Sequence, residues 1–376
     1  MRVLVVGRTI PEAATGMMGL FEIGQAYSLQ RSGKIEVCYG FVDTRSIKVF
    51  RKIRKFDQKM DGLAVYGYFL PIGGLYKKIY DQINFYLFRR LYDRIEEKEG
   101  KIDLVHIHFP LITVNSLILS FLKEKKVAII CTEHWTKIVR KLLTQREQQI
   151  LLDVCRYARQ LIAVSDDLRQ SILDYCPDFS HKVVTIPNIV DDTYAYIPRV
   201  QDETFTFLTV GRLAAIKNNL AVLRAFKKFS AENEQARLYI VGDGVEARKL
   251  QAFTAANQLE EKVIFPGFLS PTEIHQLFSQ VDVYLSASEM ETFGLPLVEG
   301  WLSGRPGIVR KTHALRQYVN EKNGLLFSAD DDLAPAMQKS FVRNYDGKKI
   351  SQSARSFFSE EAVVQQLLTL YEEALS

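Results

Sequence analysis

The stretch VDVYLSASEMETFGLPLVEGWLSGRP, residues 281–306, decides the fold that this sequence predicts. Over residues 281–286 apolar and more polar side chains alternate, as they do in a β-strand. A polar loop reaching Gly294 follows, and Pro296 then begins an apolar run that is typical of a helix and ends at Gly304. A strand, a tight loop and a helix in this order direct the free amides of a helix N-terminus toward the sheet edge, where an anion can bind.

Two carboxylates bracket this turn, Glu291 and Glu299, with seven residues between them. The helix dipole alone would favour Glu299 near the helix start, and Glu291 is equally compatible with a solvated loop position. The pair by itself therefore does not establish a site, and the rest of the chain has to decide.

The composition is that of a soluble globular protein. With 376 residues the chain predicts two domains, and its 47% hydrophobic and 25% charged residues are ordinary values. No apolar run approaches the ~20 residues that span a bilayer, and the start MRVLVVGRTIPE is typical of a short strand rather than a signal peptide. The four cysteines lack paired spacing, which favours reduced thiols and a cytoplasmic protein.

The first half begins with a strand at residues 3–6, a helix over residues 19–33 and a second strand at residues 34–40. This spacing predicts a right-handed parallel unit and hence an α/β sheet covered on both faces. In the loop before the helix, Gly16 and Gly19 would let the backbone approach a ligand closely. Ordinary turn glycines explain the same pattern equally well.

Residues 44–60 carry many cations among apolar residues spaced by four and three, which predicts a basic amphipathic helix of the kind that lies on anionic lipid. We expect its membrane or acceptor contacts to come from Arg51, Lys52, Arg54 and Lys55. A second stretch, LYKKIYDQINFYLFRRLYDRI, mixes aromatic and basic residues and is also compatible with an ordinary helix. Nucleic acid is not expected because no recognition motif accompanies the charge.

Three histidines follow strand patterns: His106 and His108 lie on one face of a strand, and His134 ends the next strand. No carboxylate or cysteine cluster completes a coordination set, so we expect no metal. A histidine at the carboxyl end of a parallel strand is instead well placed for a ligand. Ser165 is a candidate helix N-cap, and the polar residues 198–204 indicate a domain boundary.

In the second half, Arg212 and Lys217 lie in a loop between a strand and a helix that Asn218 can cap. Cations ahead of a helix N-terminus are unfavourable in the field of the dipole. They are explained if an anion such as a diphosphate binds between them and the helix amides.

The segment VGDGVEA matches the G-x-G-x-x-A dinucleotide pattern through Gly242, Gly244 and Ala247. A nicotinamide cofactor would require an acidic residue at the end of the following strand to hold the ribose. That strand ends Ile264-Phe265-Pro266, without an acid, so a dehydrogenase is not favoured.

Taken together, the chain resembles a retaining glycosyltransferase of family four, with the GT-B architecture of two Rossmann-like domains facing across a cleft. The resemblance covers essentially the whole chain. Its most specific motifs, in order, are TVGRLAAIKN, VGDG, VIFPGF, SASEMETFGLPLVEGWLSGRP and NGLLF, while GLFEIGQAYSLQRSG, DLVHIH, TEHW, AVSDDLRQSI and TIPNIVD match more loosely. It implies an acceptor domain over residues 1–195, a donor domain over residues 196–360 and a final helix, residues 361–376, that packs back on the first domain.

The resemblance also implies roles for individual residues. Four residues would be catalytic. Glu291 would contact the donor sugar, Arg212 and Lys217 would bind its diphosphate, and His134 would line the sugar pocket across the cleft. Donor contacts would come from Gly16, Gly19, Gly211, Gly242, Leu269, Phe293, Gly294, Leu295 and, on the ribose hydroxyls, Glu299. Fixed cations and helix amides would stabilise the negative charge of the leaving diphosphate without a metal or other cofactor.

The chain departs from the family pattern in two places. Where a Gly-Gly-Pro-Glu-like segment is common, His313 and Ala314 replace the glycines, and Arg316 and Gln317 replace the acid, which leaves the donor sugar undetermined. In the first-half loop, Met17 and Met18 stand where small residues are usual, and this obscures which glycine contacts phosphate.

The expected function is a metal-independent transfer of a sugar from a nucleotide-sugar, a UDP-sugar by preference, to a saccharide acceptor in cell-surface polysaccharide biosynthesis. The basic stretch favours a lipid-linked acceptor and a cytoplasmic enzyme on the inner face of an anionic membrane. The alternatives are a nucleotide-sugar-binding protein with impaired catalysis and another GT-B enzyme such as a nucleotide-sugar epimerase.

Overall fold

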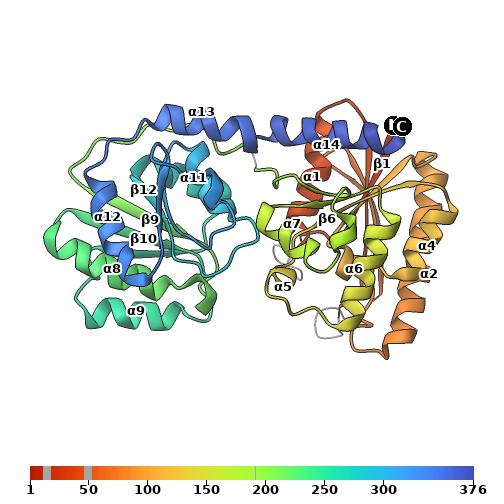
Figure 1. The fold of residues 1–376 in the computed structure, drawn as a ribbon, viewed down its shortest axis with the longest axis horizontal. Coiled ribbons are helices and arrows are strands. Elements are labelled where there is room, and N and C mark those ends of the chain that lie inside the picture. The colour runs from red at the N-terminus through yellow and green to blue at the C-terminus, as the bar shows by residue number, and fades with distance from the viewer. Residues whose placement is uncertain (12–17, 46–52, 191) are drawn as a thin grey trace. The chain divides into compact units, whose positions relative to one another are not determined.

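The structure is a computed structural model that describes residues 1–11, 18–45, 53–190 and 192–376. It divides into two compact units, each built on its own β-sheet (Figure 1). Unit 1 comprises Met1–Ile189 and Val363–Ser376, and unit 2 comprises Val190–Ala362.

The described part of unit 1 contains an eight-stranded sheet with the order β3-β4-β2-β1-β5-β6-β7-β8. Its strands are β1 (Arg2–Gly7), β2 (Glu36–Asp43), β3 (Arg54–Met60), β4 (Leu63–Phe69), β5 (Leu104–His108), β6 (Ala128–Glu133), β7 (Gln160–Ala163) and β8 (Val183–Thr185). Every pair is parallel except β3 with β4. The chain order reverses between β1 and β5, and open α/β sheets bind ligands outside the carboxyl ends of the strands at such a point.

Helices cover both faces of this sheet. They are α1 (Leu20–Arg31), α2 (Lys77–Glu99), α3 (Pro110–Thr113), α4 (Ser116–Glu124), α5 (Thr136–Val139), α6 (Gln145–Tyr157), α7 (Asp166–Leu173) and α14 (Glu360–Leu375). Because side chains of a strand alternate between faces, Val3 and Val5 join a core with α1 and α14, whereas Leu4 meets Leu91 and Ile95 of α2. The predicted return of the last helix to the first unit is confirmed.

The predicted basic helix is wrong for Arg54–Met60, which form the edge strand β3. Phe56 points inward while its neighbours Arg54 and Lys55 are exposed, and Arg54 pairs with Phe69 of β4. Apolar residues spaced by three or four cannot exclude a strand this short, and a charged edge strand resists pairing with other chains. The remaining predicted contacts, Arg51 and Lys52, lie outside the described residues.

Unit 2 contains, in the part of the chain that the structure describes, a six-stranded sheet with the order β11-β10-β9-β12-β13-β14, all parallel. Its strands are β9 (Phe205–Val210), β10 (Ala236–Val241), β11 (Val263–Gly267), β12 (Val283–Ser286), β13 (Gly307–Arg310) and β14 (Gly324–Phe327). Numbered along the unit this is the Rossmann order, with its reversal between β9 and β12.

Its helices are α8 (Asn219–Glu232), α9 (Ala247–Ala256), α10 (Pro271–Leu277), α11 (Leu295–Leu302), α12 (Leu333–Phe341) and α13 (Gly347–Phe358). Figure 1 shows α8 and α9 on one side of the strands and α11 on the other. Among the described residues of both units, the short 3₁₀ turns are η1 (Pro177–Phe179), η2 (Ala215–Lys217), η3 (Phe278–Gln280), η4 (Arg316–Tyr318) and η5 (Asp330–Asp332). The strand and helix predicted within residues 281–306 correspond to β12 and α11.

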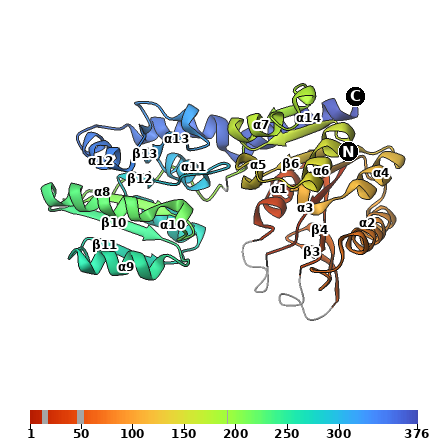
Figure 2. The ribbon, with the colours of Figure 1, turned by 60° about the horizontal axis from the view of Figure 1, so that its bottom comes forward.

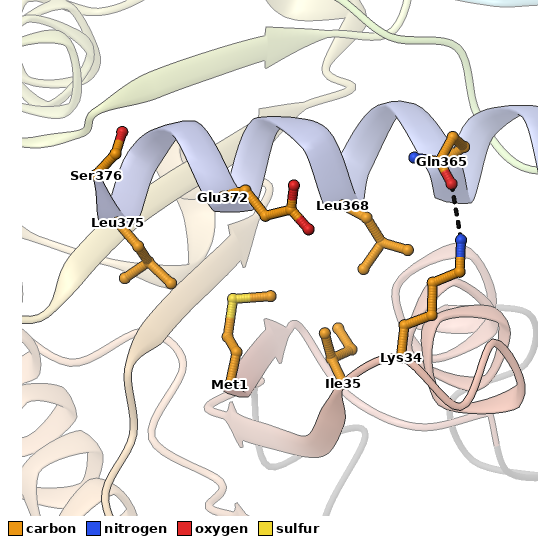
Figure 3. A pocket seen from close by; sticks show the side chains of 8 residues that line it. All are labelled: Met1, Lys34, Ile35, Gln365, Leu368, Glu372, Leu375 and Ser376. Carbon is orange, nitrogen blue, oxygen red and sulfur yellow. Dashed lines mark hydrogen bonds between the residues drawn. The ribbon is translucent and has the colours of Figure 1, made fainter.

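A surface hollow of about 420 Å³ lies at the amino-terminal end of the unit 1 sheet, beside α14 (Figure 3). It is lined by Met1, Lys34, Ile35, Gln365, Leu368, Glu372, Leu375 and Ser376. Lys34 Nζ donates a hydrogen bond of 2.8 Å to Gln365 Oε1 across it. The hollow is thus at the opposite edge from the strand ends where ligands bind in such folds. No helix among the described residues is long and apolar enough to cross a membrane.

Candidate active site

In unit 2 the candidate site is formed where the central strands β9 and β12 end. The two strands pair through Phe207 with Val283 and Leu208 with Tyr284, so their following loops start side by side. The amide of Glu289, after β12, donates a 3.0 Å hydrogen bond to the carbonyl of Ile216, after β9. This bond ties the two loops together at the reversal point of the sheet.

Lys217 and Glu291 form an ion pair on these loops. Lys217 Nζ lies 2.5 Å from Glu291 Oε1, and the two side chains are only 27% and 15% exposed. A Cβ on Gly211 would lie 3.8 Å from Lys217 Cε, so the lysine stem passes close over this glycine. The structure therefore brings together Gly211, Lys217 and Glu291, whereas the Arg212 side chain is exposed.

The start of α11 faces the same edge. Gly294 is its N-cap, with a φ of 92°, and a Cβ there would lie 2.2 Å from His313 Cε1. His313 is buried and accepts a 3.2 Å hydrogen bond on Nδ1 from the Leu315 amide. Phe293 is buried as well, and a helix start leaves its first backbone amides without intrahelical acceptors. The histidine that departs from the family pattern thus packs directly beneath the predicted anion-binding turn.

Glu299 lies in the second turn of α11 and is 7% exposed. Burial raises the pKa of the Tyr284 phenol well above its usual range, and the charges of Glu291 and Glu299 raise it further. Both carboxylates are therefore near the same phenol below the edge of the sheet. Glu299 is the deeper of the two, with 7% exposure against 15% for the Glu291 side chain.

A second polar network beside Lys217 was not anticipated from sequence. Arg310, at the end of β13, pairs with Asp330 and donates a 3.3 Å hydrogen bond to the Ala287 carbonyl. Asn218 Nδ2 donates to both carboxylate oxygens of Asp330 at 3.2 Å. The predicted capping by Asn218 is wrong, because its φ is 49° and its side chain forms no cap bond. A cation at a strand end, as in Arg310, was the available sequence signal.

The glycines of VGDG have a packing role in this structure. A Cβ on Gly242 would lie 2.0 Å from the Gly211 carbonyl oxygen, and one on Gly244 would lie 2.3 Å from that of Leu213. Only glycine allows the loops after β9 and β10 to approach so closely. Leu269, the predicted nucleobase contact, is half-buried after β11.

In unit 1 the strand ends carry a stack of planar side chains. The Arg8 guanidinium lies 3.5 Å from the Phe109 ring centroid, and Phe109 stacks on His134 at 4.5 Å. His134 Nε2 shares a 3.0 Å hydrogen bond with His108 Nδ1, and His108 stacks on His106 at 4.7 Å. Phe109 has a φ of 50°, a conformation that bulky residues rarely adopt and that is often found at functional sites.

Glu133, adjacent to His134, is completely buried beside this stack. Its Oε1 accepts hydrogen bonds from the amides of His134 and Trp135 at 2.8 and 2.9 Å, whereas Oε2 has no partner among the described residues. Burial raises the pKa of this carboxyl to about 7, although those amides and the charge of Arg8 oppose the rise. Sequence reasoning overlooked Glu133 and Arg8, although both follow the strand-end rule that selected His134.

Burial keeps the histidines of the stack neutral. It lowers the pKa of His106 and of His134 to about 3, with Arg8 contributing at His134, and it lowers the pKa of His108 well below its usual value. His106 is held by Tyr371 of α14 at 2.5 Å on Nδ1 and by Thr132 at 2.6 Å on Nε2. Among the described residues no group of three or more His, Cys, Asp or Glu side chains is arranged to hold a metal.

The other predicted residues of unit 1 lie apart from one another. Gly19 is the N-cap of α1, with a φ of 88°, and a Cβ there would lie 2.3 Å from the Thr9 carbonyl oxygen. It therefore brings the start of α1 against the segment after β1. Gly16 lies outside the described residues, and Arg54 and Lys55 are on β3, at the far edge of the sheet.

Comparison with known proteins decides the family. Residues 55–194 match the family model described as Glycosyltransferase Family 4, and residues 192–356 match the one described as Glycosyl transferases group 1. The chain belongs to the family 4 glycosyltransferases. The two matches adjoin within the chain, and the second contains Arg212, Lys217, Glu291 and Glu299.

Curated relatives of this glycosyltransferase include two proteins named alpha-monoglucosyldiacylglycerol synthase. The one from Streptococcus pneumoniae is 31% identical over 148 residues, which are 39% of this chain and only 34% of that relative. The one from Acholeplasma laidlawii is 23% identical over 305 residues, 74% of this chain and 75% of the relative.

Solved structures confirm the predicted GT-B fold class. The lipopolysaccharide outer core galactosyltransferase WaaB superposes with a TM-score of 0.74 at 19% identity, covering 99% of this chain and 100% of that one. Anabaena Alr3699/HepE in complex with UDP and glucose gives a TM-score of 0.70 at 17% identity, covering 99% of each chain. At these identities the likeness concerns the fold alone.

Proposed function

We propose that this protein transfers a sugar from a UDP-sugar to a saccharide acceptor, with retention of the anomeric configuration and without a metal ion. The observation that carries the proposal is the Lys217–Glu291 pair at the reversal point of the unit 2 sheet, next to the start of α11. Cations and helix amides at one sheet edge make a diphosphate site. The UDP bound to Anabaena Alr3699/HepE, which shares the fold, supports the choice of nucleotide.

The leaving group gives this site its chemistry. When the bond between the sugar and the diphosphate breaks, negative charge develops on the UDP oxygens. The acceptor oxygen then bonds to the sugar carbon, and its proton passes to an oxygen of the leaving diphosphate. Lys217, Arg212 and the amides of Phe293, Gly294 and Leu295 stabilise that charge. Glu291 holds Lys217 before the donor arrives and then contacts the donor sugar.

The remaining donor contacts are assigned by the same reasoning. We assign the ribose hydroxyls to Glu299 and the nucleobase to the segment around Leu269, with Gly211 and Gly242 shaping the loops between them. In unit 1 a neutral His134 is suited to hydrogen-bond a sugar hydroxyl, because it can donate or accept at pH 7. Gly16 and Gly19 are assigned to backbone contacts with phosphate.

A lipid-linked acceptor is part of the proposal. Two relatives are named as synthases of a glucosyldiacylglycerol, and another, from Rhizobium meliloti, is named as a lipopolysaccharide core biosynthesis glycosyltransferase. We place the enzyme in the cytoplasm, at the inner face of the membrane, where nucleotide-sugars and lipid-linked acceptors meet. Its pathway would be the synthesis of a cell-surface polysaccharide or glycolipid.

Calorimetry with UDP, GDP and NAD, followed by a panel of UDP-sugars, tests the function. We expect UDP to bind best and at least one UDP-sugar to be consumed at the same rate with and without a metal chelator. The anomeric proton coupling of the product should show the configuration of the donor. Absence of UDP binding, an inverted product or loss of turnover on chelation would each contradict the corresponding part of the proposal.

Removing the lysine amine tests the diphosphate contact directly. Lys217→Ala should lower kcat by about 10²–10³, which is the usual effect of losing one contact to the negative charge that develops on the leaving group. Among the described residues no other side chain pairs with Glu291, so no other cation is held at this position to replace the lysine. Lys228→Ala is the matched control, since Lys228 lies on α8 and pairs with Asp331 at 3.1 Å on the surface. Equal turnover of the two variants would refute the assignment of Lys217.

A further inference from the structure

The first half of α2 presents apolar side chains to solvent. Tyr76, at its N-cap, is 74% exposed, Ile79 is 54% exposed and Tyr86 is 56% exposed. The spacing of three and seven residues puts them on one stripe of the helix. The buried residues Asn84, Phe88, Leu91, Tyr92 and Ile95 lie on the opposite side, against the sheet. The exposed stripe is therefore not part of the core.

Cations surround this stripe. Lys77 and Lys78 open the helix, and Arg89 and Arg90 follow one turn beyond Tyr86. Arg90 Nη1 lies 3.1 Å from the Tyr86 hydroxyl, so charge and aromatic ring form one surface. Asp81 pairs with Arg146 at 2.6 Å and with Lys77 at 3.9 Å, and Asp93 pairs with Lys125 at 3.2 Å and with Arg89 at 3.7 Å. Lys78 and Arg90 add to these cations, so positive charges outnumber these acids at the solvent side.

The edge of the sheet extends the same surface. Arg54 at the start of β3 pairs in register with Phe69 at the end of β4, from which the chain runs directly to α2. Ile53, just before β3, is 73% exposed, and Arg54 and Lys55 beside it are exposed cations. Figure 2 shows β3 and α2 on the same side of unit 1. We call these residues the interfacial surface: Ile53, Arg54, Lys55, Tyr76, Lys77, Lys78, Ile79, Tyr86, Arg89 and Arg90.

We propose that the interfacial surface binds a membrane containing anionic phospholipid. Isoleucine and tyrosine side chains that alternate with lysine and arginine match the bilayer boundary, where the apolar parts enter the acyl region and the cations meet lipid phosphates. Tyrosine suits this depth because its ring is apolar and its hydroxyl remains hydrated. Of the membrane contacts predicted from sequence, Arg54 and Lys55 belong to this surface as residues of the strand β3, and α2 supplies most of the other residues.

The position of the interfacial surface suits the proposed transfer to a lipid-linked acceptor. This part of the inference rests on the proposed function. The carboxyl ends of β4 and β2 lie beside the surface, and the carboxyl end of β5, with His108, is at the same edge of the parallel sheet. A bilayer bound there would bring lipid-linked acceptors to the edge at which such sheets bind ligands.

Vesicle flotation of the full chain tests the proposal. The vesicles contain phosphatidylcholine alone or with about 30% phosphatidylglycerol, whose negative charge attracts basic segments. We expect binding to the mixed vesicles at low salt, at least fivefold weaker binding to neutral vesicles, and about tenfold weaker binding of Tyr76→Ser/Ile79→Ser. Lys78→Glu/Arg89→Glu should lose the preference for the anionic vesicles.

Matched control variants distinguish insertion of the interfacial surface into the bilayer from non-specific hydrophobic or electrostatic binding. Val342 and Val200 of unit 2 are 74% and 54% exposed, equal to Tyr76 and Ile79, so Val342→Ser/Val200→Ser should bind like the unsubstituted protein. Lys322→Glu/Arg248→Glu controls for net charge in the same way. Equal losses in test and control variants, or no binding to the mixed vesicles at low salt, would overturn the proposal.

The outcomes also distinguish this proposal from the proposed function. A protein that binds UDP and transfers sugar to a water-soluble acceptor but does not float with vesicles refutes only the interfacial surface. One that floats, and whose Tyr76→Ser/Ile79→Ser variant does not, but that fails to bind UDP refutes only the proposed function. Capture of nucleic acid by the same cations, insensitive to Tyr76→Ser/Ile79→Ser, would contradict the membrane as the occupant.

Discussion

At the scale of single residues, Gly294 shows how a backbone requirement and a packing requirement coincide. Its φ of 92° belongs to the left-handed region, and its missing Cβ makes room for the ring of His313. A sequence with smaller residues at position 313 would need only the first property. Because His313 stands at this position, any side chain larger than that of glycine at residue 294 is excluded by contact as well as by backbone strain. This residue lies at the turn assigned to the donor phosphate.

Substitution of this glycine should lower the free energy of unfolding through two separable contributions, backbone strain and overlap with His313. Gly294→Ala should cost about 3 kcal/mol in urea unfolding, since left-handed strain contributes about 1–2 kcal/mol and the overlap with His313 the rest. Gly267→Ala is the control, because Gly267 has a φ of 78° and no atom within 4 Å of its added Cβ, and should cost about 1 kcal/mol. His313→Ala should recover part of the Gly294→Ala loss; strict additivity would contradict the contact.

Glu133 is the residue whose charge depends most directly on the fold. Its pKa is raised from the usual 4.5 to about 7, so the folded state binds its proton more tightly than the unfolded chain. The carboxyl therefore stabilises the fold most below about pH 4.5, and this contribution is lost as the pH rises to 7. The buried histidines act in the opposite direction, because their lowered pKa values destabilise the fold as the pH falls below 6.5.

Comparison with Glu133→Gln isolates the carboxyl from the histidines. Between pH 5 and pH 8 the unsubstituted protein should lose about 2–3 kcal/mol of unfolding free energy relative to this variant, since one pKa unit corresponds to 1.36 kcal/mol. Urea unfolding at a series of pH values measures the difference. Parallel stability curves for the two proteins would show that the pKa of Glu133 is not raised.

At the scale of elements, the helices of this protein differ in how side chains bond to the free backbone amides of the first turn. Thr144 and Glu147 form a capping box at the start of α6, and Ser165 accepts from the Leu168 amide at the start of α7, as predicted. Asn218 occupies the equivalent position before α8 but uses its side chain to hold Asp330. The loop of Lys217 is thus held in place by a long-range contact, whereas α6 and α7 use local caps.

The two kinds of helix start predict different costs of substitution. Thr144→Ala should lower stability by about 1 kcal/mol through loss of the cap. Asn218→Gly should change stability by less than about 0.5 kcal/mol, because glycine adopts a φ of 49° easily and the lost contact with Asp330 is exposed. Urea unfolding of both variants tests this. A loss at Asn218 as large as that at Thr144 would mean that Asn218 is a cap after all.

At the scale of the whole molecule, the chain returns to unit 1 only at its end. Val363, Leu367 and Tyr371 of α14 are buried in the core of unit 1, and Tyr371 bonds to His106 in the middle of the sheet. The first unit is therefore incomplete until the last residues have been added. This arrangement couples the stability of the unit 1 site to a helix that follows the whole of unit 2.

Shortening a side chain on α14 should therefore weaken unit 1 selectively. Leu367 is fully buried, so Leu367→Ala should cost about 2–5 kcal/mol and speed hydrogen exchange in β1 and β2 more than in β9 and β10. Leu375→Ala on the same helix, at an exposed position, should cost less than about 0.5 kcal/mol. Equal acceleration of exchange in the strands of both units would contradict the assignment of α14 to unit 1.

Local chemistry was readable from the amino-acid sequence. The alternation at residues 281–286, the proline that opens α11 and the cap at Ser165 each depend on neighbours a few positions away, so their periodicity and residue types predicted the elements correctly. The order of these elements also predicted sheets built mainly from parallel strands, because a strand, a helix and a second parallel strand connect with a right-handed crossover. Family membership followed from the same motifs.

Tertiary structure alone decided which side chains meet. Lys217 and Glu291 are 74 residues apart, and His108 and His134 are 26 apart, so strand order and register bring each pair together. The same holds for β3, whose charged sequence became a strand because β4 offered it a free edge. Periodicity describes a residue's neighbours along the chain, whereas burial, and with it the raised pKa of Glu133, depends on what the rest of the fold packs around it.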